Sequence, residues 1–150
     1  MHYPPTRSPC DILARAMGGR IAEKLIFGPE AVTTGAGSDL QNVASLAKEM
    51  IVEEGMGTKT RNLVYPEGET GYYTIQTGKP YSEKTAELID EEIKKLSEEA
   101  AARAEAVLKA NRDVLDALAK ELLEKETLEE KDLVEVLKGA ELPASAKLHE

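Results

Sequence analysis

The sequence is poor in the residues that most often mark a covalent cross-link, an aromatic cluster or a membrane span. Its 150 residues include no tryptophan, one phenylalanine and one cysteine. Cys10 alone cannot form an internal disulfide, which fits a reducing compartment. No apolar run approaches the roughly 20 residues that a membrane-spanning helix needs, and no signal peptide is visible. We therefore expect a soluble chain without a membrane segment.

Motifs for several kinds of catalysis are also absent. The only histidines, His2 and His149, lie near the two ends of the sequence, where we expect frayed structure, so Ser/His/Asp and Cys/His catalysis are disfavoured. No Walker glycine loop, G-x-S-x-G or H-E-x-x-H run occurs, and the sequence predicts no ATP site in this chain. The net charge of -9 disfavours nucleic acid as a partner, because phosphate groups would be repelled.

What the sequence has in abundance is Ala, Glu, Leu and Lys, the composition of a mainly α protein packed by small aliphatic side chains. Its length suggests one domain. We expect a flexible segment at residues 1–8, a single helical domain at residues 9–139 and a flexible tail at residues 140–150.

The first helix is predicted to begin after Ser8, a good N-cap, with Pro9 at the first helical position. Its apolar stripe consists of Leu13, Met17, Ile21 and Leu25. Gly28 followed by Pro29 should end it.

Inside this helix stands a glycine pair, Gly18 and Gly19. Each glycine costs roughly 1 kcal/mol relative to alanine in a helix. We interpret the pair as a place where another segment packs close to the backbone; a kink is the alternative.

A second helix follows the stretch AVTTGAGSDLQNVASLAKEM, residues 31–50. Ser38 is predicted as its N-cap, with Gln41 completing a capping box. Asp39 would then lie at the positive end of the helix dipole, where a carboxylate caps the helix; a functional role is the alternative. The preceding loop suits a corner close to another group, and its positioning residues are Thr33, Thr34, Gly35 and Ala36. The apolar stripe of this helix is predicted to be Leu40, Val43, Ala47, Met50 and Ile51.

The second half is predicted to be a long antiparallel helical hairpin with a short closing helix. Its first helix is expected to run from about Ser82 to Lys109. The chain then turns near Asn111, and a second helix follows. Thr127 and Glu130 would form the capping box of the last helix. Before this hairpin, β-prone residues flank turn residues, which predicts a short β-hairpin near residues 62–77; a long mobile loop is the alternative.

Three stretches taken in order resemble the C-terminal peptidase domain of FtsH-type ATP-dependent zinc metalloproteases. They are ILARAMGGRIAEKLIFG, VTTGAGSDLQNVASLAKEMIVEEGMG and the long segment that begins YSEKTAELIDEEIKKL. The resemblance covers about residues 10–138. It implies a helical peptidase domain that follows a membrane anchor and an AAA+ ATPase module, assembles as a hexamer and degrades membrane and unfolded proteins. Such a domain faces the cytoplasm, the mitochondrial matrix or the chloroplast stroma.

The resemblance also implies a zinc site. In such proteases zinc is held by the two histidines of an H-E-x-x-H helix and by the aspartate of T-T-G-A-x-x-D-L, which falls on Asp39 here. This sequence departs from the pattern because it has no H-E-x-x-H. We therefore expect Asp39 to be the third ligand of an incomplete site, no tight zinc binding and no proteolysis by this chain alone. In this chain Asp39 is expected to act as a cap.

Two hypotheses follow. In the first, the chain is the C-terminal portion of an active protease, and its partners are the upstream peptidase and AAA+ segments and protein substrates. In the second, it is a non-catalytic assembly or interaction module. An apolar surface left bare around Leu13, Met17, Ile21 and the glycine pair would then drive self-association or bind a partner helix.

Overall fold

The computed structural model describes residues 8–31, 35–60 and 81–143; of residues 31 and 35–37 it describes the backbone but not the side chains. The described residues form a mainly α structure, as predicted. In chain order the elements are α1 (Pro9–Phe27), the 3-10 turn η1 (Pro29–Ala31), α2 (Gly35–Val52), α3 (Glu83–Ala110), α4 (Arg112–Lys125) and α5 (Glu130–Leu137). The β-hairpin predicted near residues 62–77 lies outside the described residues. Among the described helices, none is long and apolar enough to cross a bilayer.

Helix α1 begins and ends where the sequence predicts. Ser8 is the N-cap, and its side chain accepts a hydrogen bond from the backbone N–H of Asp11 at 3.3 Å. The Asp11 carboxylate in turn accepts from the backbone N–H of Ser8 at 3.2 Å, which completes a capping box. Gly28 ends the helix with a positive φ of 85°, a conformation that a glycine adopts without strain.

Helix α2 begins earlier than predicted. It starts at Gly35, so Ser38 lies within its first turn and is not the N-cap. The capping box expected from Ser38 and Gln41 is therefore wrong. The physical reason is that Gly-Ala-Gly does not stop a helix: alanine is the best helix former, and each glycine costs only about 1 kcal/mol.

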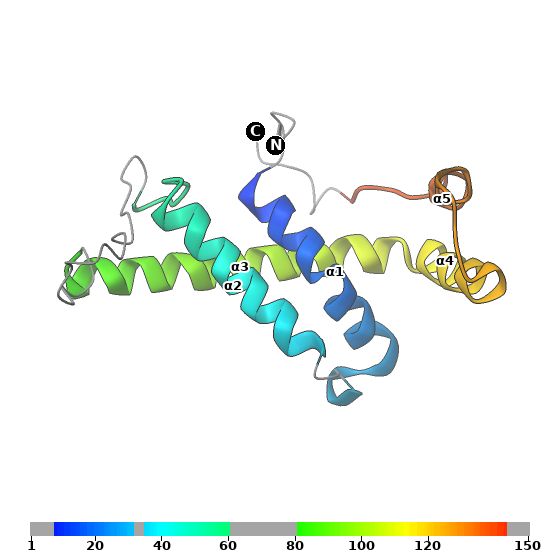
Figure 1. The fold of residues 1–150 in the computed structure, drawn as a ribbon, viewed down its shortest axis with the longest axis horizontal. Helices are drawn as coiled ribbons and strands as arrows, with labels where there is room; N and C mark the ends of the chain where they lie inside the picture. Colours follow the sequence, from blue (N-terminus) through cyan, green and yellow to red (C-terminus); the bar gives the residue numbers. More distant parts are fainter. Residues whose placement is uncertain (1–7, 32–34, 61–80, 144–150) are drawn as a thin grey trace, which may run out of the picture.

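The core lies where α1, α2 and α3 cross. Figure 1 shows α1 and α2 joined through η1 and lying across the same side of the long helix α3. The largest part of the core contains Leu13, Met17, Ile21, Val43, Ala47, Met50, Ala100 and Ala104. The predicted stripes of α1 and α2 are thus largely confirmed, but Leu40 is 41% exposed. The apolar surface expected around Leu13, Met17 and Ile21 is also wrong, because α2 and α3 cover these side chains.

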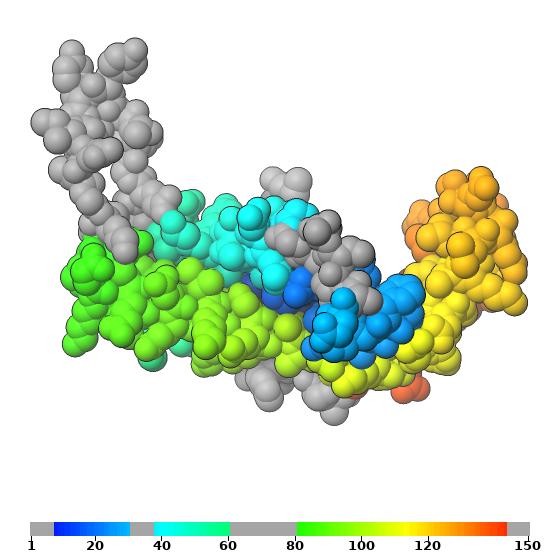
Figure 2. Space-filling view, turned by 90° about the horizontal axis from the view of Figure 1, so that it is seen from below, coloured from blue at the N-terminus to red at the C-terminus, as the bar shows by residue number. Residues whose placement is uncertain are grey.

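Helices α4 and α5 form an arm beyond this core. Neither contains a buried residue, and α4 meets α3 only near their junction. In Figure 2 the yellow and orange arm lies beyond the end of α3 and rises on the same side of α3 as α1 and α2. The turn near Asn111 is confirmed, but α4 does not fold back along α3 as the predicted antiparallel hairpin required. The apolar face of α3 already packs against α1 and α2, and Leu122 and Leu123 of α4 are 49% and 84% exposed.

Helix α5 is present as predicted but begins after Glu129, not at the Thr127 capping box. Glu126 has a left-handed φ of 59°, so the chain is still turning at Thr127. The Asp132 side chain accepts a hydrogen bond from the backbone N–H of Glu129 at 3.0 Å, and this pair caps the helix.

Candidate functional site

Asp39 is the residue that the sequence singles out most strongly, and the structure changes its local surroundings. Because α2 begins at Gly35, Asp39 lies in the second turn, and the first turn of α2 contains no acidic residue. The effect of the helix dipole falls off within the first turn, so Asp39 is not the helix cap that we expected. Its side chain is half-buried, one turn before Val43, which is 2% exposed. Within the part of the chain that the structure describes, its carboxylate has no hydrogen bond or ion pair.

The structure describes only two of the four loop residues that we predicted to have a positioning role. Thr33 and Thr34 lie outside the described residues, whereas Gly35 and Ala36 are the first two residues of α2. No group of three or more His, Cys, Asp or Glu side chains gathers anywhere in the described ranges. A zinc site of the usual kind needs three or four such ligands. The described residues therefore do not fit a zinc ion by themselves, and Asp39 is the one candidate ligand that they supply.

No described residue packs closely against the Cβ positions of the glycine pair in α1. A Cβ built on Gly18 or Gly19 would meet no described atom within 4 Å outside its own helix turn. The described residues therefore do not make the close approach that the sequence predicts here.

A buried carboxylate that we did not predict lies on α3. Glu92 is 6% exposed and faces the loop of residues 57–60 that follows α2. Its Oε1 accepts hydrogen bonds from Thr58 N at 2.5 Å, Thr58 Oγ1 at 2.7 Å and Lys59 N at 2.6 Å. Its Oε2 accepts from Thr60 Oγ1 at 2.6 Å and Thr60 N at 3.3 Å. One side chain thus satisfies three successive backbone N–H groups and two hydroxyl groups.

These hydrogen bonds decide the protonation state of Glu92. Burial alone would raise its pKa, but the bonds from Thr60, Lys59 and Thr58 outweigh burial and lower the pKa from 4.5 to about 2. The backbone of the loop also depends on a small residue at Gly57, since a Cβ there would overlap Thr60 Oγ1 and Glu92 Oε2. A signal for this contact was present in the sequence: Glu92 follows Ile89 by three residues and so lies on the apolar face of the helix, whereas most other glutamates of α3 are exposed.

A second polar contact joins α1 to α3. Arg103 of α3 forms an ion pair with Asp11, and both side chains are largely buried, at 13% and 28% exposed. The same guanidinium donates to Ser8 Oγ at 3.4 Å. The N-terminal cap of α1 is thereby fixed to α3. Cys10 is next to Asp11 in the chain. Its partial burial has the largest effect on the pKa of its thiol and raises that pKa, which disfavours a reactive thiolate.

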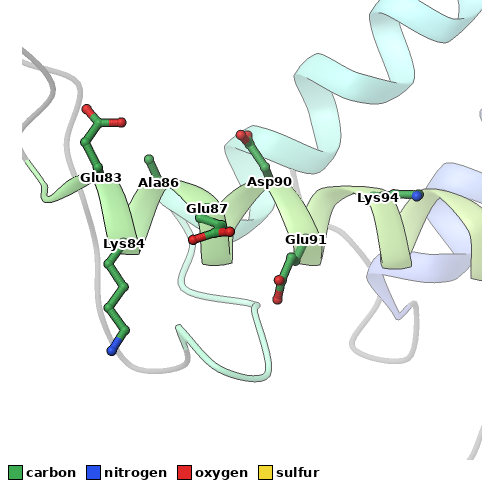
Figure 3. A pocket seen from close by; sticks show the side chains of 7 residues that line it. All are labelled: Glu83, Lys84, Ala86, Glu87, Asp90, Glu91 and Lys94. Atoms are coloured by element: carbon green, nitrogen blue, oxygen red, sulfur yellow. The ribbon is translucent and has the colours of Figure 1, made fainter.

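A surface hollow on α3 has no arrangement of side chains suited to chemistry. It is lined by residues of α3 alone, including Glu83, Glu87, Asp90 and Glu91. Figure 3 shows their side chains leaving the helix in different directions, with no common point between them. This is a solvated face of one helix.

This sequence is similar to known proteins over most of its length. A family model described as peptidase family M41 matches residues 6–136. An ATP-dependent zinc metalloprotease FtsH from Rhodothermus marinus is 44% identical over 131 residues, which cover 85% of this chain and 18% of the relative. FtsH 3 from Synechocystis is 42% identical over 128 residues, covering 83% and 21%. FtsH from Rhodococcus erythropolis is 43% identical over 132 residues, covering 86% and 15%.

The chain therefore spans about a fifth of the length of the curated relatives it matches. The matched region includes α1, the T-T-G-A-x-x-D-L stretch with Asp39, and the α3 helix with Glu92. A family model that matches most of the chain, together with relatives above 40% identity, leads to one conclusion: the chain belongs to peptidase family M41.

Proposed function

We propose that this chain is the C-terminal part of the peptidase domain of an ATP-dependent zinc metalloprotease, and that Asp39 is one ligand of its zinc ion. The observation that carries the proposal is the position of Asp39. It falls on the aspartate of the T-T-G-A-x-x-D-L motif within the M41 match. It is also a half-buried carboxylate that caps no helix and pairs with no described residue. A carboxylate in that setting is suited to a cation supplied from elsewhere.

The remaining ligands would come from a histidine pair outside this chain. On that proposal the chain alone neither binds zinc tightly nor cleaves protein. In the whole protease its partners would be an upstream peptidase segment, an AAA+ segment and protein substrates, including membrane and unfolded proteins. The relatives carry ATP dependence and zinc in their names, which supports this context for the domain.

A first experiment tests the inactivity. The purified chain is incubated with zinc and unfolded casein, and the products are followed by mass spectrometry. We expect intact casein. Cleavage that a chelator abolishes would show that the chain contains a complete site and would contradict the proposal.

A sharper experiment restores the missing ligands. The segment that precedes the matched region in the Rhodothermus marinus relative is fused to this chain, and circular dichroism confirms folding. We expect zinc-dependent casein cleavage that is lost in Asp39→Asn. Asp90→Asn, a change to an exposed carboxylate of α3, is the matched control and should retain cleavage. Equal activity in Asp39→Asn, or a folded but inert parent fusion, would overturn the assignment.

A second candidate function is a non-catalytic assembly module, and the exposed arm favours it. Leu123 is 84% exposed on α4, and Val134, Leu137 and Leu142 are 56%, 48% and 60% exposed. Exposed apolar side chains of this kind often mark interaction surfaces. We expect Leu123→Glu to reduce self-association in sedimentation experiments. Ala117→Glu is the control, because it is exposed on α4 at about 120° from Leu123 around the helix. A monomeric parent chain at high concentration would rule out self-association.

A further inference from the structure

The loop of residues 57–60, which we call the 57–60 loop, is held to α3 chiefly by one side chain. We propose that Glu92 is a conformational latch: its carboxylate keeps the 57–60 loop closed against α3, and its removal opens the loop while the α1–α2–α3 core stays folded.

The first argument is the convergence of donors. The backbone N–H groups of Thr58, Lys59 and Thr60 follow one another and all reach the Glu92 carboxylate, as do the hydroxyls of both threonines. Successive N–H groups that point at one anion form a concave anion-binding site in the backbone. Here the anion belongs to the protein itself. A neutral or truncated side chain at position 92 would leave several of these donors without their acceptor.

The second argument is the separation of the loop from the core. The principal core contains residues of α1, α2 and α3 only, and the loop supplies no side chain to it. The nearest apolar cluster, Ile51, Val52 and Ile89, belongs to α2 and α3. Opening the loop would break polar contacts and uncover Thr60, but it would leave the helix crossings in place. Segments with few buried apolar contacts are the ones that open independently of global unfolding.

The third argument concerns the charges around Glu92. Lys59 lies in the loop and forms a surface ion pair with Glu91 at 2.8 Å, with both side chains more than half exposed. Lys95 and Glu99 of α3 line a small cavity of about 50 Å³ beside Glu92, and α2 contributes the apolar Ile51. The contact at Glu92 is therefore made by hydrogen-bond donors and not by an opposite charge. Protonation would weaken it directly, because a neutral carboxyl group accepts hydrogen bonds less well.

Hydrogen exchange in two variants tests the latch. Glu92→Gln keeps the shape of the side chain but removes its charge. We expect the amides of residues 58–60 to exchange about tenfold to a hundredfold faster, while those of Val43 and Ala47 in α2 change little. Glu91→Gln is the matched control: it is the adjacent residue, it breaks the exposed ion pair to Lys59, and it should leave the loop protected. Unchanged exchange at residues 58–60 in Glu92→Gln would overturn the proposal. Equal loss of protection in α2 would overturn it too, because Glu92 would then belong to the cooperative core.

An acid titration of the parent chain gives a second measurement should Glu92→Gln fail to fold. As the pH falls towards 2, where the folded-state Glu92 carboxylate takes up its proton, we expect the amide signals of residues 58–60 to shift before the helical circular dichroism decreases. Simultaneous loss of both signals would contradict a separately opening loop.

Discussion

Glu92 illustrates how one side chain can make the stability of this molecule depend on pH. Its pKa is lowered from 4.5 to about 2 in the folded state, so the unfolded chain binds a proton more readily. The stabilisation is present above about pH 4.5 and is lost as the pH falls through the interval between 4.5 and 2. By linkage it amounts to at most about 3 kcal/mol. We expect the free energy of unfolding, measured by urea denaturation, to fall less steeply with acid in Glu92→Gln than in the parent chain. Equal slopes would mean that the carboxylate has an ordinary pKa.

Replacing glycine by alanine should change the free energy of unfolding in opposite directions at Gly19 and at Gly57. Gly19 lies inside α1 with open space around its Cβ position, so Gly19→Ala should raise the free energy of unfolding by about 0.5–1 kcal/mol. At Gly57 a Cβ would overlap Thr60 and Glu92, so Gly57→Ala should lower it by about 1–3 kcal/mol. Thermal or urea unfolding measures both changes. A destabilising Gly19→Ala would indicate that something does pack on the glycine pair, as the sequence suggested.

At the scale of elements, the sequence predicts helix ends well where one residue type dominates. Ser8, Pro9 and Gly28 each have one strong preference, and α1 begins and ends at them. The sequence predicts helix ends poorly where several neighbouring residues could act as the cap. Ser38 is a good cap by type, but the Gly-Ala-Gly run before it can also be helical, and α2 begins there. Contacts between distant segments, such as Glu92 with the 57–60 loop, depend on how helices cross and leave only a faint signal in the sequence.

A second contact of this kind fixes the chain after α5. The Asn111 side chain, at the junction of α3 and α4, donates to Glu141 O at 2.7 Å and accepts from Glu141 N at 2.6 Å. It also donates to Val107 O at 2.8 Å. We expect Asn111→Ala to lower the free energy of unfolding by about 1–2 kcal/mol and to expose the Glu141 amide to exchange. Arg112→Ala, which removes only an exposed ion pair with Asp116, is the control and should change stability by less than about 1 kcal/mol. Equal effects would show that the Glu141 contact contributes little.

For the whole molecule, the division between core and arm is the feature with most consequence. The core buries side chains from α1, α2 and α3, whereas α4 and α5 bury none, as the separate positions of arm and core in Figure 2 illustrate. Asp39 and Glu92 both lie on core helices. The candidate ligand and the loop contact are thus placed by the same packed unit, and the arm is not part of it.

This division predicts that the core folds without the arm. A chain that ends after Arg112 keeps every residue of the main core; of the described structure it loses α4 beyond its first residue, α5, residues 138–143 and the Glu141 contact. We expect it to unfold cooperatively in urea, with helical circular dichroism lower only by the helices removed, because burial of apolar surface in the core supplies most of the stability. Leu13→Ala in this shortened chain should cost about 2–5 kcal/mol, since Leu13 is fully buried in the core. A shortened chain that is unfolded, or that tolerates Leu13→Ala without loss, would show that the arm is part of the cooperative unit.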